Sequence, residues 1–107
     1  MIHMNQELFD KHVYQGDKPV LVDFWAPWCV YCRRIAPAMA KIDQQFSDIL
    51  DIAQVNIDDH PVLARQEQIE VIPTLVLYRG GEVLGSIVVP ESKAKIEAFI
   101  RDTLEEG

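Results

Sequence analysis

The chain has 107 residues, of which 49% are hydrophobic and 25% charged. These values are typical of a globular protein, and we expect residues 1–107 to form a single domain. Seventeen acidic residues against ten basic ones leave a formal net charge of −7. This balance argues against binding to nucleic acid or to an anionic membrane surface, because both need basic surface. No apolar run approaches the roughly 18 residues that a membrane-spanning helix needs.

Strand-like and helix-like segments alternate along the first half of the chain. Residues 2–4 are predicted to form a short strand, followed by a helix for which Asn5 is a suitable N-cap. Residues 20–25 form an apolar run without alternation, which is typical of a strand covered on both faces. Apolar residues then recur at helical spacing from Cys29 to Phe46, and this pattern predicts a long helix.

The second half continues the alternation. Residues 49–57 are predicted to form a strand, and residues 58–61, Asp-Asp-His-Pro, to start a short helix capped by the acids. Residues 74–78 and 82–89 flank Arg79-Gly80-Gly81, a hairpin signal. A last helix starts near residue 90 and buries Ile96, Phe99, Ile100 and Leu104. The order βαβαβαββα predicts an α/β fold.

The chain has two cysteines, Cys29 and Cys32. Residues three apart on a helix have Cβ atoms about 5–6 Å apart, so the pair can form a disulfide. We expect Cys29 in the first turn of its helix, where the helix N-terminus and the neighbouring Arg33 and Arg34 favour a thiolate. Cys32 should be more buried. The spacing by itself allows a redox pair, half of a metal site or coincidence; a redox pair is favoured because no second cysteine pair exists.

Asp23 interrupts the apolar run before the cysteines. An acid in a strand covered on both faces should be buried, and burial raises the pKa of a carboxyl group. The three histidines, His3, His12 and His60, lie far apart and have no ligand spacing. We therefore predict no metal site.

Residues 22–29, Val-Asp-Phe-Trp-Ala-Pro-Trp-Cys, together with Cys32, resemble the active-site segment of the thioredoxin family. Further family motifs follow in the same order: Ile35-Ala36-Pro37, Asn56-Ile57-Asp58, Ile72-Pro73-Thr74-Leu75 and Gly81-Glu82-Val83. The resemblance runs nearly without gaps over residues 2–104. It implies the thioredoxin fold, a central mixed β-sheet flanked by helices on both faces.

The resemblance also implies an activity: an oxidoreductase that reduces protein disulfides by dithiol–disulfide exchange. Cys29 would be the nucleophile and Cys32 the resolving thiol. Asp23 would take part in proton transfer with Cys32; the alternative is a structural carboxyl satisfied by backbone N–H groups. The redox-active disulfide would be the only cofactor.

Substrate contacts are implied for residues around the pair. Trp28 resembles the family's shielding indole, although core packing is an alternative. Tyr31 adds aromatic surface beside the reactive sulfur. Pro73, which follows Ile72, resembles the family's cis-proline, and in the family this proline helps to dock the substrate. Val89 lies in a loop that contacts partners in the family.

The implied partners are disulfide-containing proteins and a thioredoxin reductase, and the resemblance implies a monomer. No signal peptide is visible at the N-terminus, which favours a cytoplasmic reductant. The rival functions are a disulfide oxidant or isomerase, a non-catalytic thioredoxin-fold binding module, and two chains that share a metal or cluster through four cysteines.

This sequence departs from the family pattern at several positions. Val30-Tyr31 stands where most thioredoxins have Gly-Pro, and Val89 stands at a glycine position. Together with the negative charge of Glu70 near the docking rim, these changes predict a narrower partner range. Gln54 replaces a common lysine, so we expect Asp23 to stay protonated to higher pH than in lysine-bearing relatives.

Overall fold

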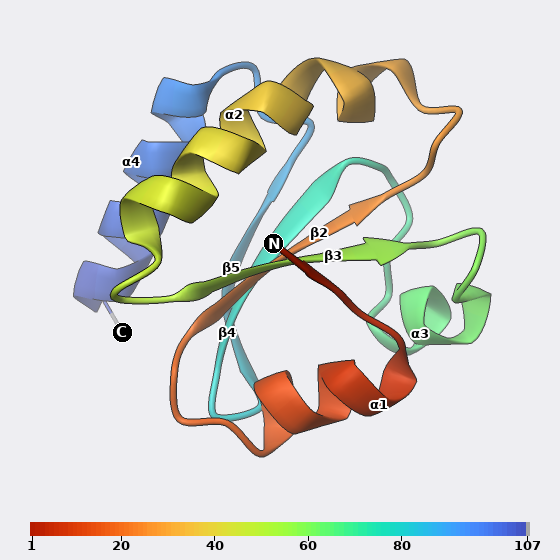
Figure 1. The fold of residues 1–107 in the computed structure, drawn as a ribbon, viewed down its shortest axis with the longest axis horizontal. Helices are drawn as coiled ribbons and strands as arrows, with labels where there is room; N and C mark the ends of the chain where they lie inside the picture. The colour runs from red at the N-terminus through yellow and green to blue at the C-terminus, as the bar shows by residue number, and fades with distance from the viewer. Residues whose placement is uncertain (107) are drawn as a thin grey trace.

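The sheet of this protein has five strands in the order β1-β3-β2-β4-β5 (Figure 1). The computed structural model describes residues 1–106. Strands β1, β3 and β2 run parallel, whereas β4 and β5 are antiparallel to their neighbours, so the sheet is mixed as predicted. The elements are β1 (Ile2–His3), α1 (Gln6–Phe9), η1 (Asp10–Tyr14), β2 (Val20–Trp25), α2 (Val30–Phe46), β3 (Asp51–Asn56), α3 (Pro61–Gln66), β4 (Thr74–Arg79), β5 (Glu82–Val88) and α4 (Lys93–Glu106).

Helices cover both faces of the sheet, as expected. Helices α2 and α4 lie together over one face, and α1 and α3 lie on the other (Figure 1). The central strand β2 serves both layers because side chains alternate between the faces of a strand. Val20, Val22 and Phe24 pack with the α1 and α3 layer, whereas Leu21 packs with the α2 and α4 layer. This two-sided burial explains the uninterrupted apolar run in the sequence.

Helix and strand boundaries follow the sequence pattern in most places. The Asn5 side chain accepts a hydrogen bond from the Leu8 N–H at 2.8 Å, which confirms the predicted N-cap. The hairpin is also confirmed: Gly80 and Gly81 have φ angles of 58° and 82°, values that glycine adopts without strain.

Strands β1, β4 and β5 each differ by one residue from the predicted ranges 2–4, 74–78 and 82–89. Three other expectations were wrong as well. Strand β3 covers Asp51–Asn56 rather than residues 49–57. Pro61 does occupy the start of α3, but the N-cap is His60 and no side chain caps this helix. Ala36 is exposed although it was predicted within the apolar pattern of α2.

The structure gives one result on membrane insertion. Within residues 1–106, no helix has both the length and the apolar character needed to cross a membrane.

Candidate active site

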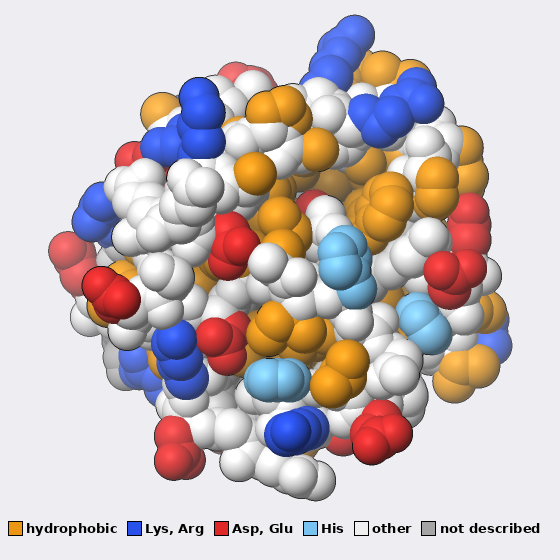
Figure 2. Space-filling view, viewed as in Figure 1, with side chains coloured by type: hydrophobic (Ala, Val, Ile, Leu, Met, Phe, Trp, Pro, Cys, Tyr) orange, Lys and Arg blue, Asp and Glu red, His pale blue; other side chains and the backbone are white. Residues whose placement is uncertain are grey.

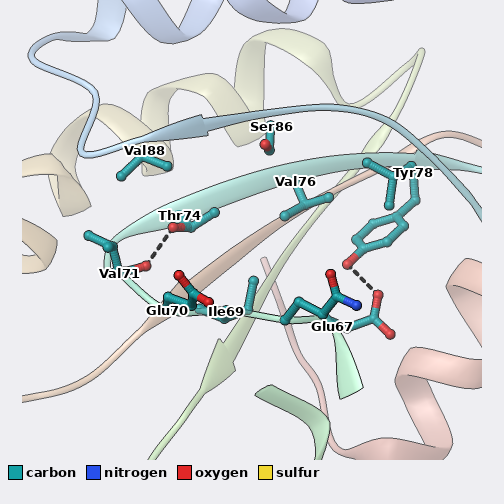
Figure 3. A pocket seen from close by; sticks show the side chains of 11 residues that line it. Glu67, Ile69, Glu70, Val71, Thr74, Val76, Tyr78, Ser86 and Val88 are labelled. Carbon is teal, nitrogen blue, oxygen red and sulfur yellow. Dashed lines mark hydrogen bonds between the residues drawn. The ribbon is translucent and has the colours of Figure 1, made fainter. Parts of the chain in front are cut away.

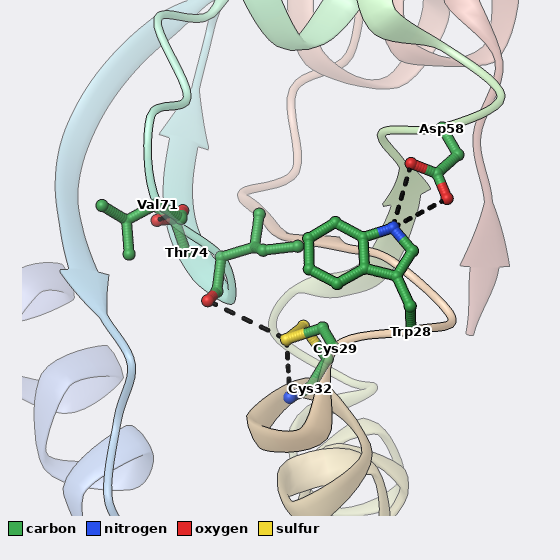
Figure 4. Close-up of a disulfide and its surroundings, with 7 residues drawn as sticks. Trp28, Cys29, Cys32, Asp58, Val71 and Thr74 are labelled. Atoms are coloured by element: carbon green, nitrogen blue, oxygen red, sulfur yellow. Dashed lines mark hydrogen bonds between the residues drawn. A yellow bond between two sulfur atoms is a disulfide. The ribbon is translucent and has the colours of Figure 1, made fainter.

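The two cysteines form a disulfide at the start of α2 (Figure 4). Their Cα atoms are 5.2 Å apart, within the range that a disulfide needs. Cys29 is the N-cap of α2 and not a first-turn residue, so its backbone is extended and its Sγ points back at the helix. The Cys32 N–H donates a hydrogen bond to the Cys29 Sγ at 3.2 Å. In the dithiol state this N–H would stabilise a thiolate on Cys29.

The two sulfur-bearing residues are almost equally buried. Cys29 is 6% exposed and Cys32 is 4% exposed in the disulfide form. Cys32 was predicted to be more buried than Cys29, and the observed difference between their exposed fractions is small. The reason is that the loop that carries Ile72 packs against both cysteines from the other side.

That loop holds the predicted cis-proline. The Ile72–Pro73 peptide bond is cis, as the resemblance implied. The Ile72 carbonyl oxygen lies 3.9 Å from the Cys29 Sγ (Figure 4). The sulfur of a disulfide carries no proton, so this is a contact and becomes a possible S–H donor only in the dithiol form.

Val89 is joined to the same loop. Its N–H donates to the Pro73 carbonyl oxygen at 2.8 Å. Val89 has a φ of 45°, a left-handed conformation that is costly for a β-branched residue and easy for glycine. The backbone thus keeps a conformation that suits glycine although a valine occupies the position.

Trp28 projects from the surface beside the disulfide. It is 64% exposed, so core packing is not its role. Its indole N–H donates to the Asp58 carboxylate, with a shortest distance of 3.0 Å (Figure 4). The Asp58 N–H in turn donates to the Asn56 side-chain oxygen at 2.9 Å. The sequence pattern had instead predicted that Asp58 caps the following helix. Only the family motif Asn56-Ile57-Asp58 could have indicated that Asp58 lies beside Trp28.

The residues between the cysteines are also exposed. Tyr31 is 54% exposed, and the Arg34 guanidinium lies 5.1 Å from the centroid of its ring. This cation–π contact holds the ring against α2. Val30 is exposed as well, so the start of α2 presents apolar surface next to Cys29.

Asp23 is the buried acid of the site. It is 2% exposed, and its Oδ1 has no hydrogen-bond partner among residues 1–106. The alternative in which backbone N–H groups satisfy the carboxyl therefore fails for this oxygen. Because side chains alternate along β2, Asp23 faces the layer of α2, the helix that carries Cys32.

The surroundings of Asp23 alter its acidity. Burial raises the pKa of Asp23 from 3.8 to about 7, because the charged form loses hydration. Gln54 is its partner on β3 in the register of the sheet. The Gln54 amide stabilises the carboxylate and lowers this pKa in part, but it carries no positive charge.

The histidines are arranged differently from what their separation in sequence suggests. His3 and His60 border one hollow of about 360 Å³, together with Gln54 and Trp25. Figure 2 shows this face of the molecule, with pale-blue histidine side chains spread over it. His12 lies 3.8 Å from the Asp51 carboxylate. Within residues 1–106, no group of three or more His, Cys, Asp or Glu side chains is placed to hold a metal ion.

Comparison with known proteins gives a consistent result. The thioredoxin family model matches residues 1–102. The chain is 41% identical over 91 residues to a thioredoxin of Alicyclobacillus acidocaldarius subsp. acidocaldarius, covering 85% of this chain and 87% of that protein. It is 38% identical over 104 residues to a thioredoxin of Acidithiobacillus ferridurans, covering 97% and 96%. Thioredoxin 1 of a Nostoc species is 44% identical over 80 residues, or 75% of each chain.

Proposed function

This chain belongs to the thioredoxin family and is a thiol–disulfide oxidoreductase, and from that premise we propose that it reduces protein disulfides. Cys29 is the nucleophile and Cys32 the resolving thiol in this proposal. The observation that carries it is the position of Cys29 at the N-cap of α2, where the Cys32 N–H points at its sulfur. A thiolate is the nucleophile in disulfide exchange, and this environment favours it.

The exchange proceeds in two displacement steps. The Cys29 thiolate attacks one sulfur of the substrate disulfide, and the other substrate sulfur leaves as a thiolate and takes up a proton. Cys32 then loses its proton and attacks the Cys29 Sγ, which releases the second substrate sulfur. In balance, the substrate disulfide gains two electrons and two protons, and the protein dithiol becomes the Cys29–Cys32 disulfide.

Asp23 is proposed as the group that accepts the Cys32 proton. A carboxyl with a pKa of about 7 can hold or release a proton near neutral pH, whereas an ordinary one cannot. Its place on the α2 face of β2 supports this role. The proton step therefore depends on the burial that makes Asp23 unusual.

Substrate binding is assigned to the residues that surround Cys29. Trp28 and Tyr31 supply exposed aromatic surface, Ile72 and Pro73 form the opposing loop, and Val89 is tied to that loop. The side chain of Val89 occupies space that a glycine would leave free. This supports the proposal of a narrower partner range than that of a general thioredoxin.

The substrates are disulfide-containing proteins, as the family implies. We further propose that a thioredoxin reductase regenerates the dithiol, that the protein is a monomer located in the cytoplasm, and that it needs no cofactor beyond its own disulfide. These four statements rest on the family and on the sequence.

The test is the equilibrium reduction potential of the Cys29–Cys32 couple in defined thiol–disulfide buffers. A potential near the roughly −270 mV of thioredoxin would support a reductant. A potential of about −120 to −180 mV would favour an oxidant or isomerase instead and would contradict the cytoplasmic location.

Two variants complete the test. Cys32→Ser should accumulate a mixed disulfide with its substrate, because the resolving thiol is missing. Cys29→Ser should lose exchange altogether. Full biological function in the double variant Cys29→Ser, Cys32→Ser would instead favour the binding module.

A further inference from the structure

A second hollow begins beside the cis-proline loop and runs along β4 and β5 (Figure 3). Its volume is about 370 Å³. It lies between the two strands and the segment that connects α3 to β4. Its lining comprises Glu67, Gln68, Ile69, Glu70, Val71, Thr74, Val76, Tyr78, Val83, Ser86 and Val88.

One end of the hollow is lined by residues that flank the cis-proline loop, which contacts the cysteine pair. Val71 and Thr74 line the end of the hollow that is nearer to the cysteines, called its near end below. In the sequence these two residues flank Ile72 and Pro73. The Thr74 hydroxyl donates to the Val71 carbonyl oxygen at 2.5 Å, which holds this end of the loop against β4 (Figure 3). Because Ile72 touches the Cys29 Sγ, a polypeptide that meets Cys29 can reach the hollow within a few residues: an extended chain advances about 3.3 Å per residue.

Five of the eleven residues that line the hollow are aliphatic: Ile69, Val71, Val76, Val83 and Val88. Val71 and Val88 are about half exposed at its near end, and Val76 lies on the strand between them and the far end. Strand β5 pairs only with β4 in the described sheet, so the wall that carries Val88 is a free edge of the sheet. Such walls suit the methylene stem of a long side chain.

The charges of the hollow are negative. The Glu70 carboxylate faces it from the connecting segment (Figure 3) and takes part in none of the ion pairs found among residues 1–106. Glu67 lies at the far end, where its carboxylate accepts hydrogen bonds from Tyr78 at 2.7 Å and Tyr14 at 3.2 Å. Neither carboxylate has a lysine or arginine partner in the described part of the chain.

We propose that this hollow binds a lysine or arginine side chain of the disulfide-bearing protein, close in sequence to the cysteine that Cys29 attacks. The stem of that side chain packs on Val71, Val76 and Val88, and its cationic head meets Glu70. This deepens the proposed function, on which it rests, by naming the chemistry of the preferred substrate. An acidic side chain would face two carboxylates, and an aliphatic one would leave Glu70 unpaired.

The test uses dimers of one short peptide joined by a single disulfide, so that both sulfurs are equivalent. The peptides carry Lys, Leu or Glu about two to four residues from the cysteine. Each reaction of the reduced protein with a dimer yields the protein disulfide and two peptide thiols. We expect the second-order rate constant to be about fivefold higher for the Lys dimer than for the Leu dimer, the size of one ion pair at a surface.

Variants separate the hollow from the overall charge of the protein. Glu70→Gln should abolish the preference for Lys, and Glu70→Lys should reverse it. Ser86→Lys, which places a cation in the hollow from β5, should weaken it. Glu91→Lys changes the net charge as much as Glu70→Lys does, but it lies outside this hollow and should keep the preference.

The outcomes distinguish the two proposals. Equal rates for the three dimers, or an equal response to Glu70→Lys and Glu91→Lys, would overturn the hollow as a cation site and leave the reductase function standing. A preference for Leu or Glu would overturn it too. If no dimer is reduced, the proposed function itself is wrong, and the assignment of the hollow falls with it.

Discussion

Two regions at the carboxyl end of β2 contrast in how they place polar and apolar groups. At the surface, Trp28, Val30 and Tyr31 expose large apolar side chains around Cys29. In the interior, a few residues earlier, Asp23 buries a carboxyl oxygen that has no hydrogen-bond partner among residues 1–106. Each arrangement costs stability, because folded proteins normally bury apolar groups and hydrate carboxyl groups. The contrast teaches where the proposed function would act: the exposed surface would meet a partner, and the buried carboxyl would handle a proton.

The largest effect is expected from removing the buried acid. The raised pKa of Asp23, from 3.8 to about 7, means that the native state binds a proton that the unfolded state releases over that interval. Stability therefore falls as pH rises through the interval and is lowest above it. Asp23→Asn should raise the free energy of unfolding at about pH 8 by up to about 4 kcal/mol, since three pKa units correspond to that energy.

Urea denaturation near pH 4 and near pH 8 measures this difference. The gain should shrink to below about 1 kcal/mol at the lower pH, where Asp23 is protonated in the native state and about half protonated in the unfolded state. Asp48→Asn, which changes an exposed carboxyl, serves as the control and should follow the parent curve. If Asp23→Asn is no more stable than the parent at the higher pH, the buried carboxyl is not the destabilising group that we describe.

A second change keeps Asp23 but gives it a cation. Gln54→Lys places an ammonium group at the register partner of Asp23, which should lower the pKa of the carboxyl by about one to two units. The inflection in the pH dependence of exchange should then move to lower pH. Gln44→Lys adds the same charge at an exposed position and should leave the profile unchanged. An unaltered profile in Gln54→Lys would remove Asp23 from the proton step.

A third change acts on the surface side of the comparison. Val89→Gly should raise the free energy of unfolding by about 1 kcal/mol, because glycine adopts a φ of 45° without the strain of a branched side chain. Val88→Gly, in the regular strand β5, should instead lower it by about as much. Thermal or urea denaturation measures both.

The same variant tests partner range. Turnover with a broad-range thioredoxin reductase should be higher in Val89→Gly than in the parent. If its partner range is unchanged, the Val89 side chain does not restrict docking.

The smallest effect is expected from Asp58→Ala, which removes the acceptor of the Trp28 indole. One lost surface hydrogen bond corresponds to about 1 kcal/mol or less, so the second-order rate constant with a protein disulfide should fall by less than about fivefold. Asp59→Ala removes a neighbouring exposed carboxyl that makes no such bond to Trp28 and should have no effect. Equal losses in the two variants would mean that overall charge matters and not the position of the indole.

Local patterns were sufficient for much of the fold and of the site. The apolar run of β2, the helical spacing after Cys29 and the Gly80-Gly81 turn each predicted the observed element, because they depend on neighbours in the chain. Burial of Asp23 followed from the same run. The motif that contains Pro73 correctly indicated a cis peptide bond through its resemblance to the family.

Other features could not be predicted from neighbours. Asp58 was assigned to a helix cap, but an indole 30 residues earlier uses its carboxylate. His3 and His60 seemed unrelated, yet they border one hollow because β1 pairs with β3, the strand whose end leads to His60. Pairing across a sheet depends on tertiary contacts that sequence separation does not reveal.

The amino-acid sequence by itself determined the alternation of elements, the disulfide-forming pair at a helix start and the burial of one acid, since these follow from spacing and side-chain chemistry along one segment. Only the tertiary structure decided which groups meet across segments: Gln54 beside Asp23, Val89 hydrogen-bonded to Pro73, and Glu70 opposite Val88. Each of these depends on the register of the sheet and the packing of loops against it, which many distant residues determine together.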